Sequence, residues 1–493
     1  MHQMAQSVDA LDARERVSPD APASAGREPS HWRARWKAFC HPIDPEKQAL
    51  LRARWESLPN ELRTPNQLAG RHLTHCGFIT GASYCSFRCT HCYLPKNANE
   101  IPIPSLAEMK EVIEANRRFQ GPGGGLQITG GDVADAYWRA GRQKELVEIV
   151  RHANRVGLVP MVMTHGQTFL EHPAFLEALV VEGGLRQLAV HIDMTQAGRP
   201  GYPINRLTSE SDLHPVREAF TQLAFQVRKR TALPLELAHN CTVTGRNLDS
   251  VAEIVRWFLF DPQRSRIWRI LSFQPEANTG RSICSPHPVT PAMVWKKLCE
   301  GMGLELDGSS YIGGHPDCNQ GTTLLVDQRS GDYRPVLPND QRTRALFTEI
   351  LQTLGAISTM TTDSLLPYRM MGAFARHPGL ASRSMARACA LVISGQMPKR
   401  FLGALLSEKA HTINIGTHNF MHASQVANAP NDLVVQARLA ACVFKGAVKN
   451  RATGQWEAVP MCAMNHSRWS ELYAQRLRPE GGPSPLSLSR NER

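Results

Sequence analysis

Three cysteines on one short stretch have the residue type and spacing of metal ligands. Cys85, Cys89 and Cys92 lie within GASYCSFRCTHCYLP, separated by three and by two residues. A 4Fe–4S cluster has four irons that each take a terminal ligand, and cysteine thiolates supply these ligands. Three thiolates on one loop would leave the fourth iron open, and an open metal position is what a catalytic site needs.

A structural zinc site is the alternative for the same loop. Structural zinc takes four ligands, which commonly come as two pairs. His75 and His91 lie nearby, but neither restores a paired spacing. The ligand count and the spacing therefore favour a 4Fe–4S cluster over zinc.

A glycine pair followed by a carboxylate is the second feature that could do chemistry. The stretch LQITGGD ends in Gly130, Gly131 and Asp132, directly after an apolar run. Glycines let the backbone approach a ligand closely, and a carboxylate can accept hydrogen bonds from an ammonium group. An ordinary turn is the alternative interpretation of the same residues.

The pattern of apolar residues predicts the elements that position these segments. Between residues 76 and 285, short apolar runs alternate with amphipathic stretches. This alternation predicts an α/β fold with six βαβ units, a partial (β/α)6 barrel whose ligands belong at the carboxyl ends of its strands. The expected strands are a segment leading into Cys85 and Leu126–Thr129, Val159–Thr164, Leu185–Ile192, Leu235–Thr242 and Ile267–Phe273.

Polar residues near the expected strand ends are further candidates. His191-Ile-Asp193 ends the fourth strand, where a polar side chain would face the barrel mouth, although Asp193 could equally cap the following loop. Arg281 follows the sixth strand, and a solvated loop arginine is the alternative there. His239 and Cys241 share one face of a strand, and core packing is the favoured interpretation of both.

The cysteine loop resembles the motif of the radical S-adenosylmethionine superfamily. That motif is Cys-x3-Cys-x-aromatic-Cys, and His91 stands in the aromatic place. The resemblance implies that Cys85, Cys89 and Cys92 bind a 4Fe–4S cluster whose open iron is chelated by S-adenosylmethionine. The cofactor is then cleaved to a 5′-deoxyadenosyl radical. The resemblance also implies a reducing electron donor of the flavodoxin or ferredoxin type.

The resemblance assigns cofactor-binding roles to other residues and leaves catalytic residues unknown. Gly130, Gly131 and Asp132 occupy the place of a Gly-Gly-Glu motif for the methionyl amine, with Asp in place of Glu. Asp193 stands where a ribose- or substrate-contacting residue is expected, and Arg281 stands at the exit of the sixth strand, near the cofactor. His91 belongs to the cofactor-binding set through the motif itself.

Cys318, Cys442 and Cys462 are candidates for a second metal centre, a further Fe–S cluster. Cys318 and Cys462 stand in loop-like segments, and the basic stretch after Cys442 would favour thiolates over thiols. The alternative is three unrelated buried cysteines. The fourth ligand is left open, with these candidates: Cys389, His418 and His422.

The C-terminal half resembles the branch that includes the archaeal tetraether lipid synthases. The segments that carry this resemblance are the cysteine settings together with SFQP, GR and NFMHA. It implies additional metal centres and a lipid-like substrate. An RNA-modifying member of the same superfamily is an alternative.

Composition divides the chain of 493 residues into five units. The two ends lack apolar periodicity and are expected to be disordered. The expected units are the tail 1–30, an N-terminal extension 31–75, the barrel 76–285, a mostly helical C-terminal module 290–475 and the tail 479–493.

Charge and hydropathy narrow the environment and the partners. The 56 Lys and Arg exceed the 44 Asp and Glu, and the net charge of +12 favours an anionic partner. A non-catalytic Fe–S or zinc protein that binds nucleic acid is therefore an alternative, although the aromatic-rich basic motifs of RNA readers are missing. No apolar run reaches about 18 residues, and the N-terminus lacks a secretory core. We expect a cytoplasmic protein without a transmembrane span.

Overall fold

The computed structural model describes most of the chain. The described residues are 31–62, 76–284, 288–308, 314–336, 339–354, 365–396, 409–450 and 453–468. The expected tails 1–30 and 479–493 lie outside the described residues, as does the end of the N-terminal extension.

Six parallel strands run through the molecule in chain order, each paired with the next. They confirm the predicted strands and the α/β class. Their bounds are β1 Cys76–Ala82, β2 Gly125–Gly130, β3 Val159–Thr164, β4 Gln187–His191, β5 Glu236–Val243 and β6 Trp268–Pro275. Their carboxyl ends therefore meet at one edge of the sheet.

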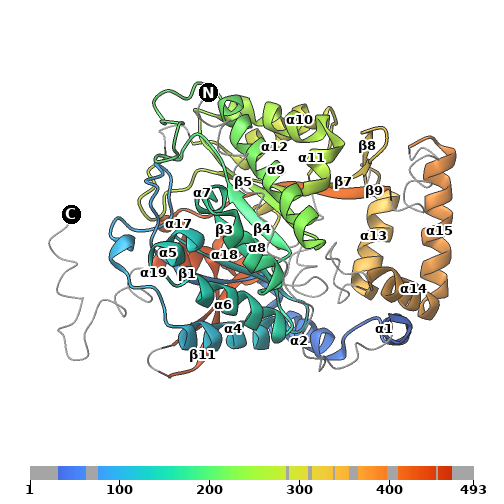
Figure 1. Ribbon diagram of the computed structural model, residues 1–493. Coiled ribbons are helices and arrows are strands. Elements are labelled where there is room, and N and C mark those ends of the chain that lie inside the picture. The colour runs from blue at the N-terminus through green and yellow to red at the C-terminus, as the bar shows by residue number, and fades with distance from the viewer. Residues whose placement is uncertain are drawn as a thin grey trace, which may run out of the picture.

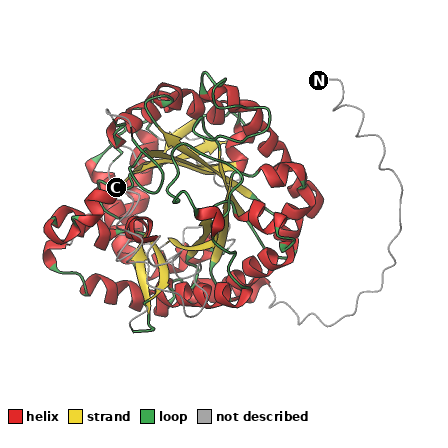
Figure 2. Cartoon of the chain, turned by 90° about the vertical axis from the view of Figure 1, so that its left-hand side faces the viewer, coloured by secondary structure: helices red, strands yellow, loops and turns green. Residues whose placement is uncertain are grey.

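Helices connect these strands and surround them, an arrangement compatible with a partial barrel (Figure 2). The first connecting helix begins at a capping box, in which the Ser105 hydroxyl accepts a hydrogen bond from Glu108 N while the Glu108 carboxylate accepts one from Ser105 N. The connecting helices are α4 Leu106–Gln120, α5 Val133–Arg139, α6 Gln143–Arg155, α7 Gln167–Glu171, α8 Pro173–Val181, α9 His214–Thr231, α10 Val251–Phe260 and α11 Pro262–Ile267.

Side chains along each strand alternate between the face of the sheet that packs in the core and the face that lines a cavity. In β3, Val162 is buried in the core between strands and helices, whereas Met161 and Met163 are half-buried and face a cavity. Successive side chains of a strand point to opposite faces, so one face packs on the helices and the other is free to line a site.

The C-terminal region extends the same sheet at both edges, so its strands are continuous with those of the barrel, while helices make up most of its described regular structure. The strand order is β11-β10-β1-β2-β3-β4-β5-β6-β9-β7-β8. The added β9 and β10 run parallel to β6 and β1, and β7, β8 and β11 are antiparallel to their neighbours. The added strands are β7 Asn319–Asp327, β8 Tyr333–Pro335, β9 Ala410–His418, β10 Phe444–Lys449 and β11 Trp456–Pro460.

The remaining helices belong to the N-terminal and C-terminal parts of the chain (Figure 1). The N-terminal α1 docks on α14, because the Arg376 guanidinium donates to the carbonyls of Phe39 and Cys40 at 3.1 and 2.6 Å. None of the described helices is both long enough and apolar enough to cross a membrane. These helices are α1 His31–Cys40, α2 Pro45–Glu56, α12 Pro291–Met302, α13 Gln341–Leu354, α14 Leu366–Arg376, α15 Pro378–Ile393, α17 Ala423–Ala427, α18 Leu433–Ala441 and α19 Met461–Arg468.

Candidate active site

A cavity of about 540 Å³ lies against the inner face of the parallel strands. This size falls within the range of about 300–1,000 Å³ that is typical of small-molecule sites. Residues at the carboxyl ends of the strands line it, and so do residues at the amino ends, such as Val159 and Glu236. The cavity therefore follows the strands along their length instead of being confined to one mouth.

The loop after β1 places three cysteines at this cavity, since Cys85, Cys89 and Cys92 all line it. Asn99 holds the start of the loop, because its side chain accepts from Cys85 N at 3.1 Å and donates to Cys85 O at 3.0 Å. Farther along, Thr90 N donates to Thr195 O at 3.0 Å. The loop is thus fixed to the protein at both ends.

Cys85 and Cys89 of this loop are poor acids by themselves. Burial raises the pKa of Cys85, and the nearby charges of Asp132 and Cys89 raise it further. Burial also raises the pKa of Cys89, with a smaller contribution from Cys92. Three thiolates this close together repel one another, and bound metal is what converts such thiols to thiolates.

The chemistry of this donor set fits a 4Fe–4S cluster. In the described part of the chain, no three His, Cys, Asp or Glu side chains are placed to bind one metal ion. A cluster distributes its thiolates over separate irons, so its ligands do not converge on one point. Three cysteines of one loop facing one cavity are the donor set that a cluster with an open iron requires.

The glycine pair packs against the backbone that leads into the cysteine loop. Gly131 N donates to Ala82 O at 2.7 Å, and Asp132 N donates to Tyr84 O at 2.8 Å. A Cβ on Gly131 would stand 2.2 Å from Tyr84 O, and one on Gly130 would stand 2.0 Å from Ala82 O. Because glycine lacks a Cβ, this turn can lie close to the backbone that leads into the cysteine loop. The contact aligns the turn with the cysteines.

The Asp132 carboxylate already has hydrogen-bond donors within the protein. Its Oδ1 caps α5 by accepting from Asp135 N at 2.8 Å. Its Oδ2 accepts from the Thr164 hydroxyl and from His165 N, both at 2.6 Å, and the side chain is 1 % exposed. Although Asp132 lines the cavity, its carboxylate ties β2 to the end of β3.

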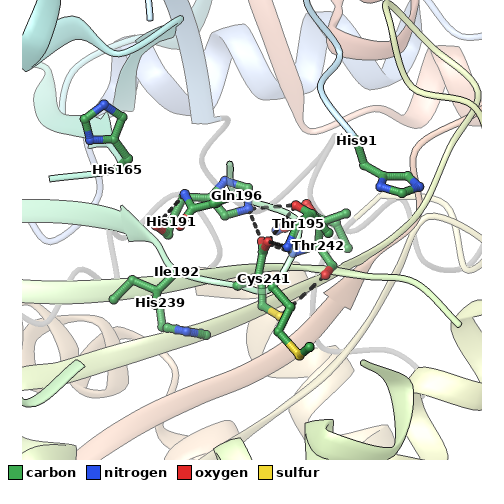
Figure 3. A network of polar contacts seen from close by, with 12 residues as sticks. His91, His165, His191, Ile192, Thr195, Gln196, His239, Cys241 and Thr242 are labelled. Atoms are coloured by element: carbon green, nitrogen blue, oxygen red, sulfur yellow. Dashed lines mark hydrogen bonds and ion pairs between the residues drawn. The ribbon is translucent and has the colours of Figure 1, made fainter. Parts of the chain in front are cut away.

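At the end of β4, the cavity-lining residue is His191, with Asp193 behind it. The Asp193 Oδ2 atom is 2.6 Å from His191 Nε2 and accepts from Thr242 N at 2.8 Å. Asp193 Oδ1 accepts from the amide and the hydroxyl of Thr195. Despite complete burial, His191 and these donors lower the pKa of Asp193 to about 2. Asp193 therefore positions His191, and Figure 3 shows the surrounding polar network.

His91 and Arg281 also line the cavity. His91 Nε2 is 3.2 Å from the buried Glu276 Oε2, and its Nδ1 is 2.9 Å from the Thr90 hydroxyl. Arg281 N donates to the carbonyls of Cys92 and Leu94, both at 3.1 Å, so the sixth-strand exit is joined to the end of the cysteine loop. The Arg281 charge acts to lower the pKa of Cys89.

Two residues that the sequence did not single out support the same loop. The Tyr93 hydroxyl donates to Gly130 O at 2.6 Å, which connects the loop to the glycine pair. Arg199 is 4 % exposed, its guanidinium lies 5.2 Å from the centre of the Phe87 ring, and its charge also acts to lower the pKa of Cys89. Tyr93 could have been found from the sequence, because it directly follows Cys92. No local pattern marks Arg199.

The structure brings Cys318, Cys442 and Cys462 together outside the cavity. Cys318 precedes β7, Cys442 ends α18 and Cys462 lies in the first turn of α19. Met421 N donates to Cys462 Sγ at 3.5 Å and Asn419 N donates to Cys318 O at 2.8 Å, and the charges of Cys442 and Cys318 act to raise the pKa of Cys462. Cys389 is exposed on α15, which lies on the other side of the molecule from α18 and α19 (Figure 1).

Comparisons with known proteins give distant structural similarities. No protein-family model matches the chain, and no curated protein matches it. A histidine-tagged form of anSMEcpe, an anaerobic sulfatase-maturating enzyme, with bound AdoMet is similar at 13 % identity and a TM-score of 0.31, over 46 % of this chain and 57 % of that chain. Native anSMEcpe with bound AdoMet and the Cp18Cys peptide is similar at 14 % identity and a TM-score of 0.31, over 45 % of this chain and 56 % of that chain. The matches span less than two thirds of those proteins.

Proposed function

We propose that this protein is a radical S-adenosylmethionine enzyme. The observation that carries the proposal is that Cys85, Cys89 and Cys92 lie on one loop after β1 and all line the cavity along the parallel strands. When bound, a 4Fe–4S cluster with an open iron supplies the electron that cleaves S-adenosylmethionine to methionine and a 5′-deoxyadenosyl radical, which abstracts hydrogen from a substrate.

The chain's own residues hold and orient the reactants. The backbone of Gly130 and Gly131 and the Tyr93 hydroxyl fix the wall beside the cysteines. Arg281 adds positive charge next to Cys89, which favours thiolates and anionic ligand groups such as a carboxylate. His191 presents a polar side chain that Asp193 orients, suited to a hydroxyl or ribose contact.

The cavity wall supports a substrate with an apolar portion. Below the strand ends, the lining includes Met161, Met163, Ala189, Ala238 and Ile270, beside the polar side chains of Gln127, Gln187 and Glu236. An apolar wall favours removal of apolar surface from water, at about 25 cal/mol per Å². We therefore propose a substrate with a slender apolar part, and a lipid-like molecule meets this condition.

Product analysis tests the proposal. Reconstituted protein, reduced anaerobically in the presence of S-adenosylmethionine, is expected to release 5′-deoxyadenosine. A variant with alanine at Cys85, Cys89 and Cys92 should release none. Cys299→Ser is the matched control, because Cys299 lies on α12, where its thiol donates to Leu306 O at 3.5 Å, and it should match the parent protein. Equal product from the triple variant and the parent protein would refute the proposal.

A further inference from the structure

A basic pocket of about 460 Å³ lies at the amino ends of three strands, away from the cysteine loop. Its charged and titratable lining residues are Arg228, Glu236, Arg266, Arg269 and His411. Glu236 begins β5, and Arg269 and His411 stand at the second positions of β6 and β9. These strands run parallel to one another and, through the sheet, to β1, so their amino ends lie at the edge opposite the loop that follows β1.

The basic pocket adjoins the cavity of the candidate active site. Glu236 and Arg269 line both cavities. Arg269 Nη1 is 3.8 Å from Glu236 Oε1, which is longer than a hydrogen bond. The boundary between the two cavities is therefore a loosely paired cation and carboxylate.

Positive charge exceeds negative charge in the basic pocket. Arg228 comes from α9, Arg266 from α11 and Arg269 from β6, so three guanidinium groups from three elements stand against one carboxylate. Among the residues that the structure describes, no carboxylate forms an ion pair with Arg228 or Arg266, and Arg266 is exposed. Such an excess favours an anionic ligand.

Two buried polar atoms of this lining lack hydrogen-bond partners in the described part of the chain, namely Arg269 Nε and His411 Nδ1. The other ends of both side chains are held. Arg269 Nη2 donates to the Thr412 hydroxyl at 3.1 Å, and His411 Nε2 is 2.9 Å from the Ser265 hydroxyl. A buried polar group without a partner is destabilising, and a polar ligand offsets that cost.

The arginines also act on one another. Burial lowers the pKa of Arg228, and although Glu236 acts to raise it, the charges of Arg266 and Arg269 act to lower it further. An anion among like charges removes their repulsion. Guanidinium groups bind phosphate oxygens through paired hydrogen bonds, and a phosphate monoester carries a charge of about −1.5 to −2 at pH 7. Phosphate therefore matches the charge excess of this pocket better than a carboxylate does.

We propose that the basic pocket binds a phosphate group, either as inorganic phosphate or as the end of a chain-bearing ligand whose apolar part passes Glu236 and Arg269 into the adjoining cavity. Phosphate binding is independent of the cysteine loop, which lies at the opposite edge of the sheet. The identification of a chain-bearing ligand as the substrate rests on the proposed function.

Calorimetric titration of the full-length protein with inorganic phosphate, in a buffer free of phosphate and sulfate, tests the site. The parent protein is expected to bind phosphate saturably. The double variant Arg266→Gln, Arg269→Gln should bind it at least about tenfold more weakly, because two charge-assisted contacts are lost.

The double variant Arg155→Gln, Arg230→Gln is the matched control. It removes the same net charge from residues that are 58 % and 52 % exposed and that do not line the basic pocket. Its affinity for phosphate should stay within about twofold of the parent value, because exposed charges outside the pocket are screened.

Decyl phosphate, titrated below the concentration at which it forms micelles, distinguishes the two sources of the phosphate group. Tighter binding of decyl phosphate than of inorganic phosphate by the parent protein, lost in Arg266→Gln, Arg269→Gln, assigns the site to the end of a chain-bearing ligand. Equal affinities assign it to free phosphate.

The inference is overturned if the parent protein shows no saturable phosphate binding, or if the two double variants bind phosphate equally well. Far-ultraviolet circular dichroism checks that each variant is folded. If Arg266→Gln, Arg269→Gln does not fold, the exposed Arg266→Gln alone is expected to weaken binding about threefold. Unchanged affinity there also overturns the inference. Because 5′-deoxyadenosine is not the readout, failure of the proposed function leaves this result separate.

Discussion

Cys85, Cys89 and Cys92 lie on one loop, whereas Cys318, Cys442 and Cys462 come from three segments that meet only in the folded protein. The first group lines the cavity, and the second is not part of its lining. The loop is held by hydrogen bonds to Asn99, close by in the sequence, and to Thr195 after β4, but the second group depends on the packing of α18, α19 and β10. A contiguous ligand set can be recognised by its spacing, while an assembled one is defined by tertiary structure.

The largest expected effect comes from disturbing the support of the first group. In Gly131→Ala the added Cβ would overlap Tyr84 O, so the turn and the cysteine loop must separate. Overpacking of this kind destabilises a protein by about 3 kcal/mol. We expect the iron bound by the cysteine loop, about four per chain, to be lost.

Gly245→Ala is the matched control for that experiment, because its Cβ would meet no atom within 4 Å. Iron counting and urea denaturation measure both effects. An unchanged iron content in Gly131→Ala would mean that the glycine turn does not position the cysteine loop.

Replacement of Asp132, whose carboxylate accepts hydrogen bonds at the end of β3, should give the next largest effect. Asp132→Asn removes a charged acceptor of the Thr164 hydroxyl and His165 N, at a cost of about 2–3 kcal/mol for buried donors. The midpoint of urea denaturation should therefore fall. Asp249→Asn is the control, because Asp249 is 93 % exposed. A lower affinity for S-adenosylmethionine with an unchanged midpoint would show instead that the carboxylate serves the ligand.

The part of the sheet that carries neither cysteine group has its own pH dependence. Burial, with Arg269 and Arg266 nearby, lowers the pKa of His411 from its ordinary value of 6.5 to about 3. The unfolded chain therefore binds more protons than the folded protein between about pH 6.5 and 3, so stability is lost as pH falls through that window.

Between about pH 7.5 and 5, the contribution of His411 to this loss is about 2 kcal/mol. Urea denaturation at both pH values should show a smaller loss in His411→Gln than in the parent protein. Equal losses would mean that another buried group controls the acid sensitivity of this region.

Local patterns were sufficient for the parallel strands and for the cysteine loop, but not for contacts between distant segments. The strand ending at Thr164 was predicted because a short apolar run stands between amphipathic stretches, and the structure places it in the sheet beside its neighbours in chain order. In contrast, β9 and β10 pair with β6 and β1, far away in sequence, so their segments were placed in a helical module. The role of Arg199 also arises from tertiary contacts alone.

How far the role of a site residue could be predicted depended on the same distinction between local patterns and tertiary contacts. Asp193 was singled out by its position after a strand, but the residue that lines the cavity is His191, two positions earlier. Side-chain direction alternates along a strand. Where the strand ends, a loop follows, and the sequence does not specify the course of that loop. The cysteines at 318, 442 and 462 were recognised by residue type and setting, and their proximity became visible only in the fold.

The central claim is that the first cysteine group binds a cluster with an iron open to S-adenosylmethionine. Electron paramagnetic resonance of the reduced, reconstituted protein tests it. The account predicts a reduced 4Fe–4S signal that changes when S-adenosylmethionine is added and that disappears when Cys85, Cys89 and Cys92 are replaced. A signal that S-adenosylmethionine leaves unchanged, or that persists without those three cysteines, would contradict the account.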